Sequence, residues 1–119
     1  MKFDYVFDYE PDVMDVVDRI RVVYCEPRKL ARVIELGTDL TDLQQAVGGG
    51  IEPFYGLDDP ACCLVCDEEG KYDGALPNRA VRDENGKIVD IIFGPFFICD
   101  CRTEEFRSLS DEQIRHFTD

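Results

Sequence analysis

The run Ala61-Cys62-Cys63-Leu64-Val65-Cys66 constrains the fold of this chain more than any other stretch. A short apolar run bounded by turn residues is typical of a buried strand. It ends abruptly in Asp67-Glu68-Glu69-Gly70-Lys71, a polar turn, and a second strand-like run opens around Asn78-Arg79. We therefore expect a strand, a carboxylate-rich turn and a return strand, around which the rest of the domain is organised.

Other strands are predicted where apolar or alternating runs are separated by turn residues. Asn85-Gly86 lies between two of them and is a strong signal for a β-hairpin. Pro53 places another run at a sheet edge or a bulge, since proline cannot donate to the ladder. The predicted strands are residues 19–25, 30–36, 51–57, 61–66, 75–82, 87–93 and 96–99.

A helix is predicted after the second strand. Thr41 and Gln44 have the spacing of a capping box, although Thr38 or Asp39 would begin the helix one turn earlier. The glycines at 48–50 end it, because glycine accepts the left-handed conformation at a helix C-terminus. No GK[ST] sequence follows the glycines, so they do not indicate a phosphate-binding loop.

A second capping box, Ser110 to Gln113, predicts a C-terminal helix with Ile114 and Phe117 turned inward. The 119 residues suffice for one domain with its own core, over residues 19–119. Because consecutive strands dominate, the expected fold is α+β: a mainly antiparallel curved sheet or open barrel. It has five to seven strands and two or three short helices, one of them on the concave face.

Residues 1–18 precede this domain and have their own character. Strict alternation over residues 3–9 puts aromatic rings on one side of an extended segment. We favour an edge strand that closes the core; the alternative is an arm that lies on a partner or adds to its sheet. The residues of this predicted arm are Phe3, Asp4, Tyr5, Phe7, Asp8 and Tyr9.

The formal net charge is −13, from 26 acidic and 13 basic residues. Such a chain is repelled by phosphate backbones and anionic lipid, which argues against direct nucleic-acid or membrane binding and favours basic protein surfaces as partners. No apolar run is long enough to cross a bilayer, and Met1-Lys2-Phe3-Asp4 does not lead into a signal peptide. We expect a cytoplasmic protein whose six cysteines are reduced and packed as small hydrophobes.

The cysteines also raise the possibility of a structural zinc site. Cys63-x-x-Cys66 and Cys99-x-Cys101 are two ligand pairs that meet if their strands are neighbours. On a regular strand, however, Cys63 and Cys66 point to opposite faces. Buried thiols are the favoured interpretation, and neither a metal nor a cofactor is expected.

The polar residues around the central turn suggest a second kind of site. Their side chains would supply a general acid and base or Mg²⁺ ligands, with Asn78-Arg79 binding a small anion such as a nucleotide. No known catalytic motif accompanies them, and the one histidine, His116, belongs to the C-terminal helix. The members of this predicted polar cluster are Glu52, Asp67, Glu68, Glu69, Asn78 and Arg79.

A purely structural interpretation of the same cluster is favoured. Glu68 to Lys71 is then a turn with Gly70 at positive φ, and Asn78 caps it through its amide. Arg79 pairs with Glu68 or Glu69 across neighbouring strands. An enzyme is accordingly the less expected function.

Several separated motifs keep their order and spacing in a known family, from about Ile20 to the C-terminus. The chain resembles a domain-of-unknown-function family of small proteins carried on plasmids, conjugative elements and phages of Firmicutes and gut bacteria. This family usually has Asn-Glu-Glu-Gly where the chain has Asp67-Glu68-Glu69-Gly70. The motifs are Val47–Glu52, Cys66–Lys71, Leu76–Ala80, Asp90–Ile98 and Phe106–Gln113.

The resemblance implies an accessory protein of a mobile element and supplies no reaction. By analogy with proteins of that genetic setting, some of which present carboxylates in place of DNA phosphates, it suggests an anti-defence role. The expected function is binding of a host protein, one that itself binds nucleic acid, through acidic surface. The alternatives are a small-anion or nucleotide binder or enzyme that uses the polar cluster, and a zinc-stabilised module.

Overall fold

The computed structural model describes residues 19–118, so the predicted arm lies outside the described residues. These residues form seven strands and two helices, in the order β2 (Arg19–Cys25), β3 (Arg32–Gly37), α2 (Leu40–Val47), β4 (Ile51–Phe54), β5 (Cys62–Asp67), β6 (Pro77–Arg82), β7 (Ile88–Phe93), β8 (Phe96–Asp100) and α3 (Asp111–Thr118). The α+β fold is confirmed, and each predicted strand is present with slightly shifted ends. β4 ends at Phe54 and does not extend to Leu57.

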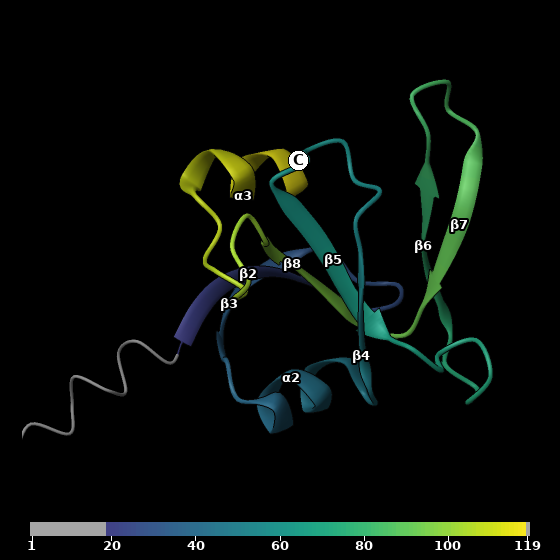
Figure 1. Ribbon diagram of the computed structural model, residues 1–119. Coiled ribbons are helices and arrows are strands. Elements are labelled where there is room, and N and C mark those ends of the chain that lie inside the picture. Colours follow the sequence, from purple (N-terminus) through teal and green to yellow (C-terminus); the bar gives the residue numbers. More distant parts are fainter. Residues whose placement is uncertain (1–18, 119) are drawn as a thin grey trace, which may run out of the picture.

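The strands form two antiparallel sheets rather than one curved sheet or barrel (Figure 1). The larger sheet has the order β3-β2-β8-β5-β4, and β6 and β7 form a separate hairpin. β8 lies between β2 and β5, which places Val23 opposite Ile98 and Cys63 opposite Cys99. β4, with Pro53, is an edge strand as predicted.

Both faces of the large sheet are covered, which explains why β5 is apolar at successive positions. Cys62, Leu64 and Cys66 pack on one face. Cys63 and Val65 pack on the other. All six residues of β5 are buried, as expected for a central strand enclosed between two layers.

The helices lie on opposite faces of the large sheet (Figure 1). Leu43 and Val47 of α2 pack on one face, and Ile114 and Phe117 of α3 pack on the other. In α3 the predicted capping box is confirmed: the Ser110 N–H donates to Gln113 Oε1 at 2.8 Å, and the Gln113 N–H donates to Ser110 Oγ at 3.1 Å.

The predicted capping box of α2 is wrong. The N-cap is Asp39, whose extended backbone precedes the helix, and its side chain makes no capping hydrogen bond. Thr41 lies within the first turn instead. At the other end Gly48, with φ of 88°, donates its N–H to Gln44 O, so the predicted glycine stop is confirmed.

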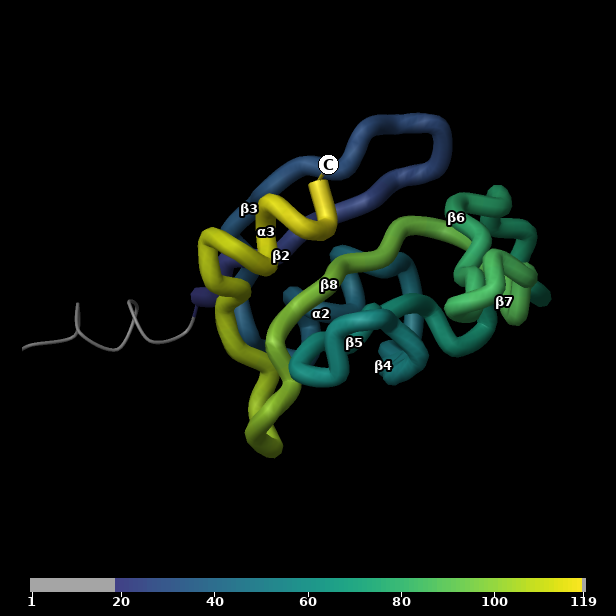
Figure 2. The backbone as a smooth tube through the Cα atoms, turned by 90° about the horizontal axis from the view of Figure 1, so that it is seen from above, coloured from purple at the N-terminus to yellow at the C-terminus, as the bar shows by residue number. Residues whose placement is uncertain are grey.

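The β6–β7 hairpin stands to one side of the large sheet (Figures 1 and 2). Its turn is organised by Asp83, whose Oδ1 accepts the N–H groups of Asn85 and Lys87 at 2.9 Å each. Gly86, with φ of 82°, supplies the left-handed residue that closes the turn. Val81 and Ile92 are its buried residues and join it to the core on the face that α3 covers.

Candidate functional site

The structure divides the predicted polar cluster between two places. Glu52, Asp67 and Glu68 line a cavity of about 280 Å³ beside β7. Arg79 instead lines a larger groove, of about 840 Å³, between the hairpin and the large sheet. The residues of the cluster therefore do not surround one ligand position, which removes the geometric support for a nucleotide site or an enzyme built from all of them.

The first part is an acidic turn, defined here as Glu52, Asp67, Glu68, Glu69 and Asp73. Asp67 is its buried member, with 8% of its surface exposed, and its Oδ1 accepts the Glu69 N–H at 2.9 Å. The turn's left-handed glycine is Gly74, so the prediction of positive φ at Gly70 is wrong.

The glycine run after α2 makes room for this turn. A Cβ on Gly49 would lie 2.5 Å from Asp67 Oδ1, closer than side chains approach one another. The run therefore has a second role beside ending α2, because it lets the carboxylate of Asp67 approach the backbone. This contact joins two of the motifs on which the sequence resemblance rests.

Asp67 is held in an unfavourable electrostatic environment. Burial raises the pKa of its carboxyl, and the neighbouring Asp73 and Glu69 carboxylates raise it further, against the lowering effect of the Glu69 N–H. Because the folded-state pKa lies above the unfolded one, ionisation of Asp67 costs stability as the pH rises through the folded-state pKa.

Replacing Asp67 with asparagine should therefore stabilise the fold at pH 7. Asparagine keeps the oxygen that accepts the Glu69 N–H and removes the charge. The gain should shrink as the pH falls, because Asp67 itself becomes protonated in the folded state. Thermal denaturation of both proteins between pH 4 and pH 8 measures this difference.

Asp90→Asn is the matched control with the opposite sign. Lys71 Nζ lies 3.0 Å from Asp90 Oδ1, and this hydrogen bond lowers the pKa of Asp90. Neutralising Asp90 should lower the melting temperature at pH 7 and have less effect in acid. If Asp67→Asn and Asp90→Asn changed the melting temperature in the same direction, the opposite electrostatic environments assigned to these two carboxylates would be contradicted.

Asn78 and Arg79 act as a clamp between the hairpin and the rest of the domain. Asn78 Nδ2 donates to the carbonyl oxygens of Cys25, at 3.0 Å, and Gly94, at 2.8 Å. Arg79 donates to Asn78 Oδ1 at 2.6 Å and to Lys29 O at 2.8 Å.

The expected pairing of Arg79 with Glu68 or Glu69 does not form, and Asn78 does not cap that turn. Arg79 reaches backbone carbonyls of the β2–β3 loop, among them Glu26 O at 3.5 Å, instead of a carboxylate. The structural interpretation of the two residues is supported, with partners other than the predicted ones.

The four cysteines predicted as weak zinc ligands do not all converge, although Cys63, Cys99 and Cys101 belong to the same core cluster. Cys66 packs on the opposite face of β5 from Cys63 and Cys99, whose sulfur atoms are 3.9 Å apart. Residues 19–118 contain no group of three or more His, Cys, Asp or Glu side chains arranged to hold a metal ion.

All six cysteines are free thiols. Burial raises the pKa of Cys62 to about 12 and that of Cys66 to about 11, so both are protonated thiols at neutral pH. Five of the six are buried, and Cys101 is half-buried. Their role as small core residues matches the favoured expectation.

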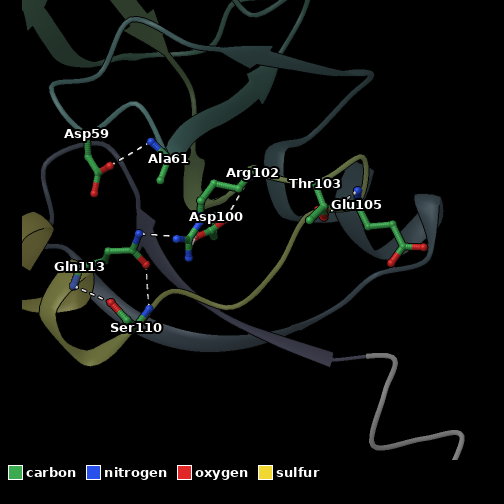
Figure 3. A network of polar contacts seen from close by, with 8 residues as sticks. All are labelled: Asp59, Ala61, Asp100, Arg102, Thr103, Glu105, Ser110 and Gln113. Carbon is green, nitrogen blue, oxygen red and sulfur yellow. Dashed lines mark hydrogen bonds and ion pairs between the residues drawn. The ribbon is translucent and has the colours of Figure 1, made fainter.

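A polar network, which was not predicted from the sequence, surrounds Asp100 at the C-terminal end of β8 (Figure 3). Asp100 is 2% exposed, and its carboxylate accepts hydrogen bonds from the Arg102 guanidinium and, at 3.4 Å, from Gln113 Nε2. Burial alone would raise the pKa of Asp100, but these bonds and the Arg102 N–H together lower it. The sequence signal was an acidic residue that ends an otherwise apolar strand.

His116 lies in the last turn of α3, half-exposed, with Nε2 3.0 Å from the Asp58 carboxylate. Neither residue belongs to the predicted polar cluster. The pair bridges α3 to the β4–β5 loop, and Asp58 also lines the groove that Arg79 lines.

The fold and these surfaces define a small α+β domain with an acidic turn at the end of β5 and an apolar groove on one face. Neither helix within residues 19–118 has the length and apolarity needed to cross a membrane. The chain belongs to the DUF3846 family, a domain of unknown function, whose model matches residues 20–119. No curated protein and no solved structure matches the chain.

Proposed function

We propose that the chain is a non-enzymatic accessory protein of a phage or conjugative element, which binds a basic, nucleic-acid-binding surface of a host protein. Through this contact it would inhibit a host defence. The observation that carries the proposal is the set of exposed carboxylates at the acidic turn, which have no cationic partners among residues 19–118. Net charge of −13 extends the same field over the molecule and would speed encounter with a basic surface.

The carboxylates of this turn differ from those elsewhere in the domain. Glu52, Glu68, Glu69 and Asp73 are exposed, and within residues 19–118 none of them forms an ion pair. They are carried by an edge strand and a turn anchored through buried Asp67, so they are presented from a fixed backbone. A fixed group of carboxylates is suited to arginines and lysines that otherwise contact phosphates.

Neutralising this surface should weaken capture of the partner about tenfold, which is about 1.4 kcal/mol. The variant is Glu52→Gln, Glu68→Gln, Glu69→Gln, and the matched control is Glu104→Gln, Glu105→Gln, Glu112→Gln. Each variant removes three negative charges. The control residues come after β8 in the chain, Glu112 in α3 and the other two in the loop before it. β8 ends at Asp100, which pairs with Cys62 at the opposite end of β5 from Asp67. Capture from host lysate, quantified by mass spectrometry, compares the proteins.

The same capture should weaken steeply as salt rises from about 50 mM to about 300 mM, because the contacts are between exposed charges. If the acidic-turn variant and the control variant lose the same amount of capture, the effect comes from net charge and not from the acidic turn. Capture that is indifferent to both salt and the variants contradicts the proposal.

A further inference from the structure

We propose that the groove between the β6–β7 hairpin and the large sheet binds a small amphipathic carboxylate, with Arg79 receiving the anionic group. This site is separate from the acidic turn and from the partner contact proposed above. Its ligand has an apolar body and a single negative charge.

The shape and lining of the groove fit such a ligand. Its floor consists of Leu64, Phe96 and Ile98 from the central strands, and Phe117 of α3 and Val81 of the hairpin also line it. A volume of about 840 Å³ is within the range of small-molecule sites, roughly 300 to 1,000 Å³. The floor is provided by rigid strands, so the groove is formed before any ligand arrives.

Arg79 is the less exposed of the two arginines that line the groove. It is half-buried, and within residues 19–118 it forms no ion pair with a carboxylate, although the chain has twice as many acids as bases. Its bonds to backbone carbonyls and to Asn78 use Nη1 and Nη2 and hold the guanidinium in place. A fixed guanidinium beside apolar surface is suited to accept a carboxylate, because charge-assisted hydrogen bonds strengthen where water is displaced.

The other charges of the groove disfavour a ligand with several negative charges more than one with a single negative charge. Asp58, Asp83 and Glu84 also line it, against Arg79 and Arg82, which leaves one excess negative charge. A polyphosphate would meet these carboxylates and be repelled. A monocarboxylate needs only Arg79, while its apolar body covers the floor.

The rim also favours an apolar body over a wholly polar anion. Leu30 is 91% exposed and Val89 is 55% exposed, and both line the groove. Contact between these exposed apolar side chains and the tail of a ligand would bury apolar surface, which favours binding.

Titration of the full chain with octanoate, followed by ¹⁵N–¹H NMR, tests the proposal. Octanoate should produce saturable shifts at Val81 and Ile98, and octylammonium, with the same tail and opposite charge, should bind at least about tenfold more weakly. The comparison is stringent because a protein of net charge −13 attracts cations in general. Equal binding of the two probes, or no saturable shift with octanoate, overturns the proposal.

Four variants, two at Arg79 and two at Leu30, locate the charge. Arg79→Gln should weaken octanoate binding about tenfold, and Arg79→Lys should restore part of it. Since Arg79 also supports the fold, Leu30→Glu and Leu30→Lys give an independent pair: the exposed position tolerates both, and the glutamate should weaken octanoate binding while the lysine strengthens it. Identical affinities for the two Leu30 variants would contradict a carboxylate site at this rim.

Discussion

Replacing Asp100 with asparagine should lower the free energy of unfolding by about 2 kcal/mol at neutral pH, the typical worth of hydrogen bonds to a charged group. The carboxylate is buried and accepts bonds from the Arg102 guanidinium, the Arg102 N–H and Gln113. Asparagine keeps the shape but turns one acceptor into a donor that faces the guanidinium. Urea denaturation at pH 7 measures the loss.

The loss should depend on pH in a defined direction. Because the pKa of folded Asp100 is lowered, its stabilisation is present above the ordinary aspartate pKa of about 3.9 and disappears as the pH falls through the folded-state value. Wild type and variant should therefore converge in acid. Convergence at alkaline pH instead would contradict the assigned environment.

Asp111→Asn is the matched control for this prediction. Asp111 also pairs with an arginine, at 2.7 Å from Arg21, but its side chain is 77% exposed. Exposed pairs contribute less than about 1 kcal/mol. If Asp111→Asn lowered the free energy of unfolding as much as Asp100→Asn does, burial would not set the strength of these ion pairs.

Replacing Asn78 with alanine should destabilise the domain by about 2 to 3 kcal/mol, because two carbonyls lose their donor and Arg79 loses an acceptor. The effect should be largest in the hairpin, since Asn78 binds Cys25 O on one side and Gly94 O on the other. Hydrogen exchange at Val81 and Ile92 should accelerate more than at Val65 in the centre of the large sheet.

Asn85→Ala controls for loss of an asparagine from the same hairpin. Asn85 is exposed in the turn and contributes only its backbone N–H to the bond with Asp83. Its replacement should change stability by less than about 0.5 kcal/mol. If hydrogen exchange in Asn78→Ala accelerated equally in both sheets, the hairpin would not be a unit that Asn78 holds separately.

Local signals in the sequence predicted local structure well. Asn85-Gly86 identified the hairpin, Ser110 and Gln113 identified the start of α3, and the run at 61–66 identified a buried strand. Each of these features is decided by residues within a few positions of one another. The capping box at Thr41 failed because the competing start at Asp39 lies only two residues earlier and no local feature separates the two.

Long-range pairing was beyond local signals. The position of β8 between β2 and β5 joins residues more than 30 apart in the chain, as in the pairing of Leu64 with Ile98. Consecutive strands suggested a single sheet, and the separate hairpin breaks that expectation.

Arg79 shows the same limit at the level of the site. Charge patterns suggested a carboxylate partner, but the guanidinium binds carbonyl oxygens, which carry no sequence signature. The β2–β3 loop that supplies them is 50 residues away from Arg79. The groove itself depends on where the hairpin lies relative to the sheet, so it too could not be read from the sequence.

Competition with DNA tests the proposed function most directly. The captured partner, held on the immobilised chain at low salt, is challenged with short duplex DNA. Release of the partner as DNA binds it is the predicted result, because the acidic turn and the phosphates would occupy the same basic surface. Formation of a stable ternary assembly, in which the partner holds the chain and DNA together, would contradict it.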